Sequence, residues 1–137
     1  MVPSTLSWVE GYSDASHSSD VDTVHDLDRL LDRLTAVAVE LELPFNVTLA
    51  RDAEAWVDII VGAHVAAVQW IRREPWSCLV GVDPSRSEEG DPITFAGNGQ
   101  HSELDRKWCV QPALARDAIR HYLTTGQLTP ALRWEPF

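Results

Sequence analysis

The sequence predicts an α+β fold, in which a mainly antiparallel sheet of about six to seven strands packs against two helices. In two segments, residues 24–41 and 114–123, apolar side chains recur every three or four positions, which is the spacing of a helix with one buried face. Most of the remaining chain consists of short runs rich in β-branched and aromatic residues, separated by turn-forming residues. No strand–helix–strand unit repeats, so antiparallel pairing is favoured over a parallel sheet.

The first third of the chain predicts a strand, a polar loop and a helix. Residues 5–10 are β-prone and are followed by Gly11, which is typical of a strand that ends in a turn. Residues 13–22 are mostly Ser, Asp and His, and we expect them to form a loop that leads into the helix. The candidates for the helix cap are Ser19, Asp20 and Asp22. The helix ends before Pro44, because the residue before a proline is disfavoured in helical backbone.

The middle of the chain predicts an antiparallel meander of four strands. We expect these strands at residues 45–50, 55–61, 65–71 and 77–82. The gaps at residues 62–64 and 72–75 are of hairpin length, so neighbouring strands are expected to pair antiparallel. Residues 83–92 are polar and rich in breakers, which predicts an exposed loop before a short strand at residues 93–95.

The last third predicts more sheet, a helix and a final strand. Gly97 and Gly99 indicate a turn or bulge, and residues 103–104 and 107–110 are expected to resume the sheet. Pro112 is typical of an early position in a helix, and this helix is expected to end at Gly126. The alternating residues 131–135 predict a closing strand.

Length and charge restrict the class of protein. With 137 residues, 45% of them apolar, the chain is expected to form one domain over residues 1–137. Eleven Lys and Arg against 21 Asp and Glu give a formal charge of -10, which opposes binding to nucleic acid or anionic membranes and favours a basic partner. The same charge would also serve to keep a cytoplasmic protein soluble.

We expect a cytoplasmic location. Residues 1–10 lack the basic and then apolar pattern of a signal peptide, and no run approaches the roughly 18 apolar residues needed to span a bilayer. Cys78 and Cys109 form no Cys-x-x-Cys pair, which excludes a zinc knuckle or a thioredoxin-type motif, and both are expected to be buried thiols.

The sequence holds no arrangement that predicts catalysis, and we expect no cofactor and no metal ion. The five histidines lack the spacing that places two ligands on one helix face. His101, Ser102 and Glu103 are adjacent, but on a strand His101 and Glu103 share one face while Ser102 points away, which is poor geometry for a proton relay. The segment 97–99 lacks the Lys-Ser/Thr of a phosphate-binding loop.

The positions of the carboxylates and tryptophans in the expected elements predict whether they lie at the surface, in the core or at an interface. On or beside the first helix, a set of carboxylates is expected to form a solvated face: Asp26, Asp28, Asp32, Glu40 and Glu42. Within the expected strands, four tryptophans are expected in the core: Trp8, Trp56, Trp70 and Trp134. Trp108 lies beside Arg106 and Lys107 and is a candidate contact residue, because aromatic anchors dominate many interfaces.

The second half of the chain carries an ordered series of motifs. Residues 95–104 read Phe-Ala-Gly-Asn-Gly-Gln-His-Ser-Glu-Leu, a helix is expected to end at Thr125-Gly126, and Trp134-Glu135 lies in the last strand. The series resembles the first immunity-protein family of bacterial polymorphic toxin systems, over residues 45–137. The resemblance implies an α+β fold and the neutralisation of a cognate toxin by tight binding. It also implies a nucleic-acid deaminase as the toxin, with a nuclease as the alternative.

We therefore expect an immunity protein, and not an enzyme, that covers the active-site groove of a basic toxin acting on nucleic acid. The expected toxin contacts lie between the meander and the last helix: Glu88, Glu89, Asp91, Asn98, Gln100, His101, Glu103 and Trp108. Two rival interpretations stay open. One is a small enzyme or small-molecule-binding protein with a pocket between helix and sheet near His101 and Glu103. The other is a structural subunit whose acidic face docks on a basic neighbour.

Overall fold

The computed structural model describes residues 4–85 and 89–137 and confirms the α+β class. These residues form nine strands, two α-helices and one short 3-10 helix, so the sheet is larger than predicted. In chain order the elements are β1 (Ser4–Val9), β2 (Ser16–Val21), α1 (Val24–Leu41), β3 (Phe45–Ala50), β4 (Ala55–Val61), β5 (Ala67–Arg72), β6 (Ser77–Val82), β7 (Ile93–Gly97), β8 (Gln100–Leu104), η1 (Arg106–Trp108), α2 (Pro112–Thr125) and β9 (Arg133–Pro136).

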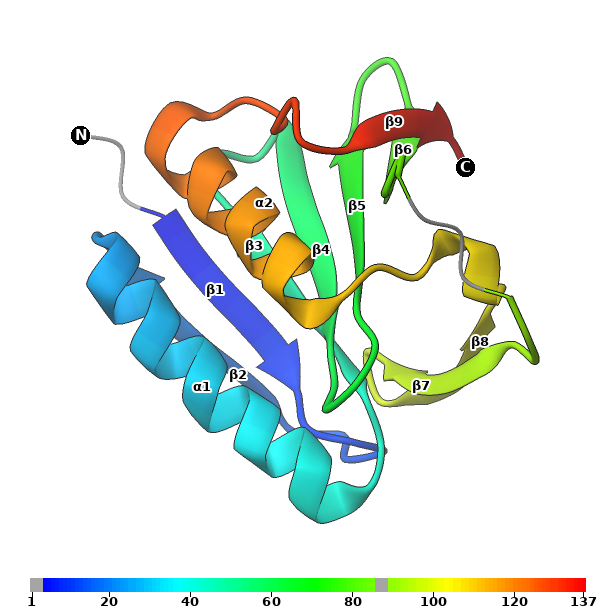
Figure 1. Ribbon diagram of the computed structural model, residues 1–137. Coiled ribbons are helices and arrows are strands. Elements are labelled where there is room, and N and C mark those ends of the chain that lie inside the picture. Colours follow the sequence, from blue (N-terminus) through cyan, green and yellow to red (C-terminus); the bar gives the residue numbers. More distant parts are fainter. Residues whose placement is uncertain (1–3, 86–88) are drawn as a thin grey trace.

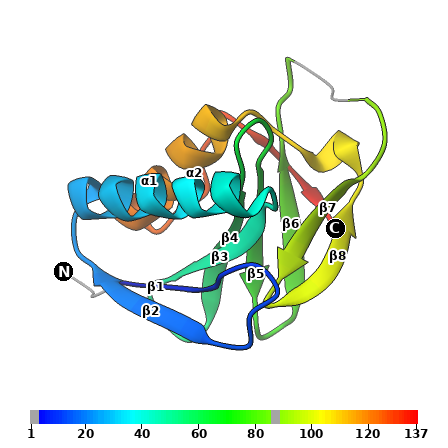
Figure 2. The same ribbon diagram turned by 90° about the horizontal axis from the view of Figure 1, so that it is seen from below.

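One sheet holds all nine strands of the described chain. Its order is β2-β1-β3-β4-β5-β6-β9, and every neighbouring pair along this path is antiparallel. β7 lies off this path: it pairs with β3 through a parallel bridge between Phe45 and Ala96, and β8 pairs with β7. Both α-helices lie on one face of the sheet, and no α-helix of the described chain lies on the opposite face (Figure 1; Figure 2).

The prediction of a loop at residues 13–22 is wrong. Ser16–Val21 is the strand β2, which pairs with β1 along its whole length. Five of its six side chains are exposed, because β2 is the outermost strand of the sheet. The strand pairs through backbone hydrogen bonds and lacks the alternation of apolar and polar residues by which strands are predicted. The predicted helix caps are also wrong, since Thr23 Oγ1 accepts a hydrogen bond from the Asp26 backbone N–H at 3.1 Å and caps α1.

The four-strand meander is confirmed as β3 to β6, with its third strand beginning at Ala67 and not at residue 65. The predicted return to the sheet at residues 107–110 is wrong for most of its length. Asp105 accepts a hydrogen bond from the Lys107 backbone N–H at 3.0 Å and caps η1, so the chain turns away from the ladder. Only Val110 rejoins the sheet, through an isolated bridge to Ala66.

The main hydrophobic core lies between the two α-helices and the sheet. Each helix buries one stripe of residues at helical spacing. The stripes consist of Leu27, Leu31, Leu34 and Ala38 in α1 and of Ala115, Ala118, Ile119 and Tyr122 in α2. From the central strands, alternate residues point into the same core: Phe45, Val47, Leu49, Val57 and Ile59. This packing fixes which face of each central strand is turned toward the helices.

Two carboxylates of α1 pair with arginines of α2. The prediction of a solvated face is confirmed for Asp32, which stays exposed, and is wrong for Asp28, which is half-buried. Arg116 binds Asp32, and Arg120 Nε donates to Asp28 Oδ1 at 2.8 Å. The hydrogen bond to Asp28 raises the pKa of the Arg120 guanidinium further above its ordinary value. These pairs join the two helices to each other.

Three of the four tryptophans predicted for the core contribute to it. Trp8 is buried, and Trp70 and Trp134 pack against the main core. Trp56 differs, because it alternates with the main-core residues of β4 and lies half-buried on the opposite face. There the guanidinium of Arg73 lies 5.5 Å from the centroid of the Trp56 ring.

A second, smaller core lies between the β7–β8 hairpin and the sheet face opposite the helices. It consists of Ile60, Ala67, Ile93, Leu104 and Cys109, with Val65, Phe95 and Trp108 packed against it. Ile60 and Ala67 belong to this face because they are cross-strand partners that alternate with main-core residues. The hairpin therefore covers one end of the face that has no α-helix.

The tip of the hairpin depends on Gly99, and the predicted turn is confirmed. Asn98 and Gly99 both have positive φ, 51° and 85°, which is the conformation of a two-residue turn that matches the twist of the strands. A Cβ at Gly99 would lie 2.5 Å from the carbonyl oxygen of Ser13 in the β1–β2 turn. Glycine alone combines this backbone conformation with such a close approach.

Gly99→Ala is expected to lower the free energy of unfolding by at least about 1 kcal/mol, because alanine is strained at positive φ and its Cβ displaces the β1–β2 turn. Urea denaturation of the purified variant measures the change. Asn98→Gly in the same turn is the matched control, since glycine accepts the positive φ and adds no contact. An unchanged midpoint for Gly99→Ala would contradict the close contact with Ser13.

Candidate functional site

The residues predicted to contact a partner lie along the β7–β8 hairpin and the segments that flank it. Glu88 lies outside the described residues. The other seven, here called the hairpin surface, are Glu89, Asp91, Asn98, Gln100, His101, Glu103 and Trp108. Six of them are exposed, and Trp108 is half-buried. The fold thus presents these side chains on one hairpin, at its tip, along β8 and at its base.

The β1–β2 turn extends the tip of the hairpin. Tyr12 Oη lies 3.3 Å from His101 Nδ1, and the centroids of the two rings are 6.5 Å apart. Tyr12 is 54% exposed, so a large aromatic side chain stands beside the polar tip. Exposed aromatic residues next to polar groups are frequent interface anchors. No pattern in the sequence indicates Tyr12, because its contact joins residues 89 positions apart.

His101, Ser102 and Glu103 do not form a catalytic relay. Cross-strand pairing places His101 and Glu103 on one face of the hairpin and Ser102 on the other, as strand alternation predicts. The Ser102 hydroxyl donates to the Gln100 carbonyl at 3.3 Å, and the His101 ring contacts Tyr12. Within residues 4–85 and 89–137, no three His, Cys, Asp or Glu side chains are grouped to hold a metal ion.

The 3-10 helix η1 holds the base of the hairpin. Arg106 Nε donates to the carbonyl oxygen of Asp91 at 2.8 Å, which ties the loop before β7 to η1. Lys107 Nζ lies 4.7 Å from the centroid of the Trp108 ring. The Phe137 ring meets the Trp108 ring edge-on, with 6.1 Å between the two centroids. Trp108 is therefore held by its neighbours while part of its ring stays accessible, an arrangement that suits an interface anchor.

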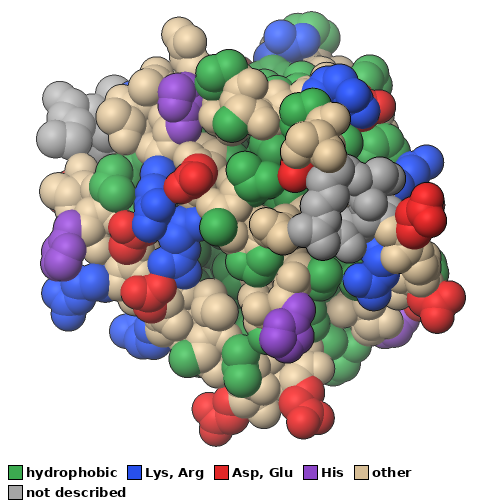
Figure 3. Space-filling model, in the orientation of Figure 1, with side chains coloured by type: hydrophobic (Ala, Val, Ile, Leu, Met, Phe, Trp, Pro, Cys, Tyr) green, Lys and Arg blue, Asp and Glu red, His purple; other side chains and the backbone are tan. Residues whose placement is uncertain are grey.

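The helix-bearing face offers a surface of mixed charge. Acidic and basic side chains are interspersed over α1 and α2, where Asp28 and Asp32 pair with Arg120 and Arg116 (Figure 3). Neighbouring charges of opposite sign cancel at a distance, so this face produces no extended field of one sign. We therefore expect a basic partner to bind a part of the molecule other than the helix-bearing face.

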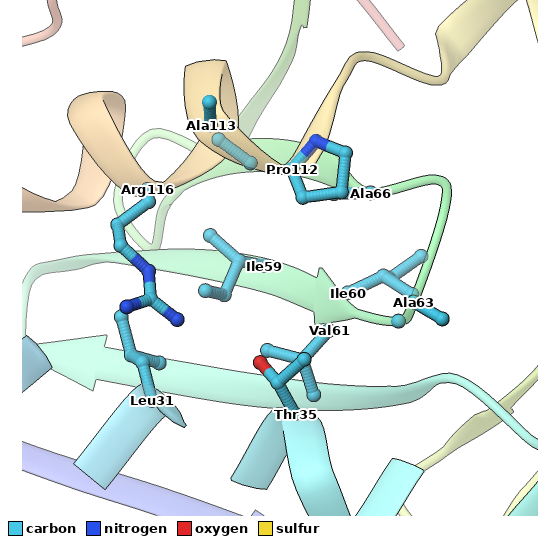
Figure 4. A pocket seen from close by; sticks show the side chains of 12 residues that line it. Leu31, Thr35, Ile59, Ile60, Val61, Ala63, Ala66, Pro112, Ala113 and Arg116 are labelled. Carbon is cyan, nitrogen blue, oxygen red and sulfur yellow. The ribbon is translucent and has the colours of Figure 1, made fainter. Parts of the chain in front are cut away.

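An apolar pocket of about 290 Å³ opens between the two α-helices and the β4–β5 turn (Figure 4). Aliphatic side chains such as Ile59 form most of its wall, and Arg116 is the one charged side chain among its described lining residues. That guanidinium is already paired with Asp32. Neither His101 nor Glu103 lines this pocket, so it is not the pocket of the rival interpretation.

The sheet face opposite the helices, here called the helix-free face, carries a row of polar residues. Cross-strand pairing aligns one residue from each of five neighbouring strands: Ser18, Ser7, Thr48, Asp58 and Gln69. Asp58 is half-buried, and its Oδ1 accepts a hydrogen bond from Thr48 Oγ1 at 2.5 Å. Burial raises the pKa of the Asp58 carboxyl above its ordinary value, although the hydrogen bond from Thr48 acts in the opposite direction.

Asp58 is a candidate functional residue that the sequence patterns did not single out, although they contain a signal for it. It is the one charged residue between Ala55 and Val61, within a run that is otherwise apolar. Nearby on the helix-free face, Cys78 is half-buried, so the prediction that both thiols are buried is wrong for this one. Burial and then the charge of Asp58 raise the pKa of the Cys78 thiol.

Similarity to known proteins identifies the family. The family model described as Immunity protein Imm1 matches residues 15–136, which is nearly the whole chain. The chain belongs to the Imm1 family. Among curated proteins, none matches it. The family match begins before β2 and includes α1, so it reaches further toward the N-terminus than the resemblance over residues 45–137.

Membership of the Imm1 family makes the chain an immunity protein, whose partner is a cognate toxin. The matched region includes the whole hairpin surface, η1 and most of β9. It also includes β4, and with it the Asp58 carboxyl on the helix-free face. In the part of the chain that the structure describes, neither α-helix has the length and apolar character needed to cross a membrane.

In this Imm1 protein, Asp58→Asn is expected to increase the free energy of unfolding at pH 7. Folding raises the pKa of the Asp58 carboxyl. Such a carboxyl stabilises the folded protein fully below its unfolded pKa, about 3.9, and this stabilisation is lost as the pH rises through the folded pKa. Asparagine keeps an acceptor for Thr48 and removes the buried charge. Urea denaturation should show the variant more stable at pH 7, with a smaller difference at acidic pH.

The control for this experiment is Asp26→Asn, which removes the same charge from an exposed position on α1. Its stability is expected to fall slightly, because Asp26 lies in the first turn of α1, where a carboxylate is favourable beside the helix N-terminus. The opposite sign of the two effects distinguishes loss of a buried charge from loss of an exposed one. A lower stability of Asp58→Asn at pH 7 would contradict the upward shift of the Asp58 pKa on folding.

Proposed function

We propose that this protein neutralises a cognate toxin of the nucleic-acid deaminase type by covering the basic active-site groove of the toxin with the hairpin surface. The observation that carries the proposal is the Imm1 family match over residues 15–136, which supports a toxin as the partner. The immunity protein itself catalyses nothing and inhibits by occupying the place of the substrate.

The charge of the chain supports a basic partner. A groove that binds nucleic acid is lined with Lys and Arg, and a protein with a formal charge of -10 meets it with the opposite sign. Opposite charges accelerate encounter and disfavour wrong partners. On the hairpin surface, Glu89, Asp91 and Glu103 are exposed, and none of them forms an ion pair with another described residue.

The composition of the hairpin surface supports its role as the contact. Polar side chains at the tip, Asn98 and Gln100, offer hydrogen-bond donors and acceptors, and both are exposed. Aromatic side chains lie at the two ends, with Tyr12 beside the tip and Trp108 at the base. Aromatic anchors surrounded by polar groups are typical of protein interfaces.

Occlusion fits the chemistry of a deaminase. Enzymes that act on a nucleobase take it out of the stack into a pocket beside the groove that holds the phosphates. A protein that fills this groove excludes the substrate without contacting the catalytic groups. A nuclease toxin would be blocked in the same way, and the product of the purified toxin distinguishes the two.

Co-expression of this protein is expected to protect cells from its cognate toxin, which is to be sought among the genes next to its own. Survival on induction of the toxin, with and without the immunity gene, measures protection, and assays of base deamination and strand cleavage by the purified toxin identify its activity. Loss of viability in the presence of the folded immunity protein would exclude the proposed function.

A variant that combines Glu88→Lys, Glu89→Lys and Trp108→Ala is expected to bind the toxin at least about tenfold more weakly, because it reverses two charges and removes an anchor. Calorimetry with a catalytically inactivated toxin domain measures Kd. Glu40→Lys combined with Glu42→Lys, at exposed positions at the end of α1, also reverses two charges; it is the matched charge control and should leave Kd little changed. Since Trp108 packs on the second core, urea denaturation checks that the variant is folded. Unchanged affinity of this variant would remove the hairpin surface from the interface.

A further inference from the structure

We infer that Asp58 is a docking point for one basic side chain of the toxin, an Arg or Lys of its nucleic-acid-binding groove, on the helix-free face. This inference rests on the proposed function and adds a second contact to the hairpin surface. Four observations support it: the position of Asp58 in the sheet, its lack of a cation, its aromatic surroundings and its connection to Trp108.

The strand pairing places Asp58 in the middle of an accessible polar row. Ser7, Thr48, Asp58 and Gln69 are cross-strand neighbours in four adjacent strands, and all four are half-buried. No α-helix of the described chain covers this face, because both α-helices lie on the other side of the sheet (Figure 2). A partner can therefore approach the row without displacing an α-helix.

The Asp58 carboxylate has no cation to balance it. Its hydrogen-bond partner in the described chain is the Thr48 hydroxyl, and no ion pair between described residues includes Asp58. Arg73 lies over the Trp56 ring on this side, but its Nε donates to the Ala53 carbonyl. A half-buried carboxylate without a cation is costly for the free protein. A partner that places a cation against it recovers that cost on binding.

Aromatic side chains flank Asp58 on the helix-free face and connect it to the hairpin surface. Trp56 precedes Asp58 by two positions on the same side of β4. Toward β6, the charge of Asp58 helps to raise the pKa of the Cys78 thiol. The backbone carbonyl of Cys78 accepts a hydrogen bond from the Phe137 backbone N–H at 3.0 Å. Phe137 is 60% exposed and meets Trp108 edge-on. Cys78 and Phe137 therefore link the β6–β9 side of the helix-free face to Trp108 of the hairpin surface.

Charge complementarity selects the occupant. A carboxylate between the hydroxyl of Thr48 and the amide of Gln69 offers several acceptors to a guanidinium or ammonium group. Nucleic acid or an anionic membrane would be repelled at the same place. The groove of a nucleic-acid-acting toxin is rich in the basic side chains that fit here.

Asp58→Asn tests the inference in the full-length protein. Calorimetry measures its binding to the catalytically inactivated domain of the cognate toxin, and Kd is expected to rise at least about tenfold. The variant is expected to be at least as stable as the wild type, whereas loss of a purely structural residue would lower stability and leave Kd unchanged. Asp26→Asn removes the same charge from the helix side and should leave Kd little changed.

Gln69→Lys is the second variant, and it decides the case if Asp58→Asn folds poorly. It places an ammonium group on the neighbouring strand directly opposite Asp58. The carboxylate is then paired within the immunity protein, and the added charge repels the cation of the toxin, so Kd is again expected to rise at least about tenfold.

The outcomes separate this inference from the proposed function. Weaker binding by Asp58→Asn and Gln69→Lys, but not by Asp26→Asn, supports docking at Asp58. Wild-type affinity in both variants, together with weaker binding by the hairpin-surface variant, overturns docking at Asp58 and leaves the proposed function intact. Failure of the wild-type protein to bind the toxin overturns both.

Discussion

The register of β3, β4 and β5 determines how both faces of the sheet are used. Because strand residues alternate, burial of Val57 and Ile59 beneath the helices directs Asp58 to the opposite face. A shift of one residue would move Asp58 into the main core and expose its two apolar neighbours, which the packing of α1 and α2 opposes. The main core thereby holds the polar row in place, although none of the row belongs to it.

The hairpin contacts the rest of the chain at its tip, along its length and at its base. Its tip is fixed where Gly99 meets the Ser13 carbonyl, and its base is fixed by the hydrogen bond from Arg106 to Asp91. Between these points the second core packs it against the sheet. A surface held at both ends loses little conformational entropy when a partner binds. In the proposed complex, this favours tight association, which an inhibitor needs if it is to leave little active toxin free.

Elements with their own periodicity and turn residues were predictable, and elements fixed by tertiary contacts were not. The meander, α2 and the turn at Asn98 belong to the first group. β2 belongs to the second, because its polar side chains carry no alternation and its pairing comes from β1. In the candidate site, strand alternation predicted that His101 and Ser102 lie on opposite faces of β8. The contact of Tyr12 with His101 could not be predicted, because it joins distant parts of the chain. Asp58 had a local signal, but its polar neighbours come from other strands.

The composition of β2 has a consequence for the behaviour of many copies together. β2 ends the sheet, and within the described chain only β1 pairs with it, so one flank of its backbone is open. An open flank is a template on which a strand of another molecule can add, and apolar edges are the most prone to this. The Ser, His and Asp side chains of β2 make such growth unfavourable. At high concentration, copies of this protein are therefore less prone to join through β2.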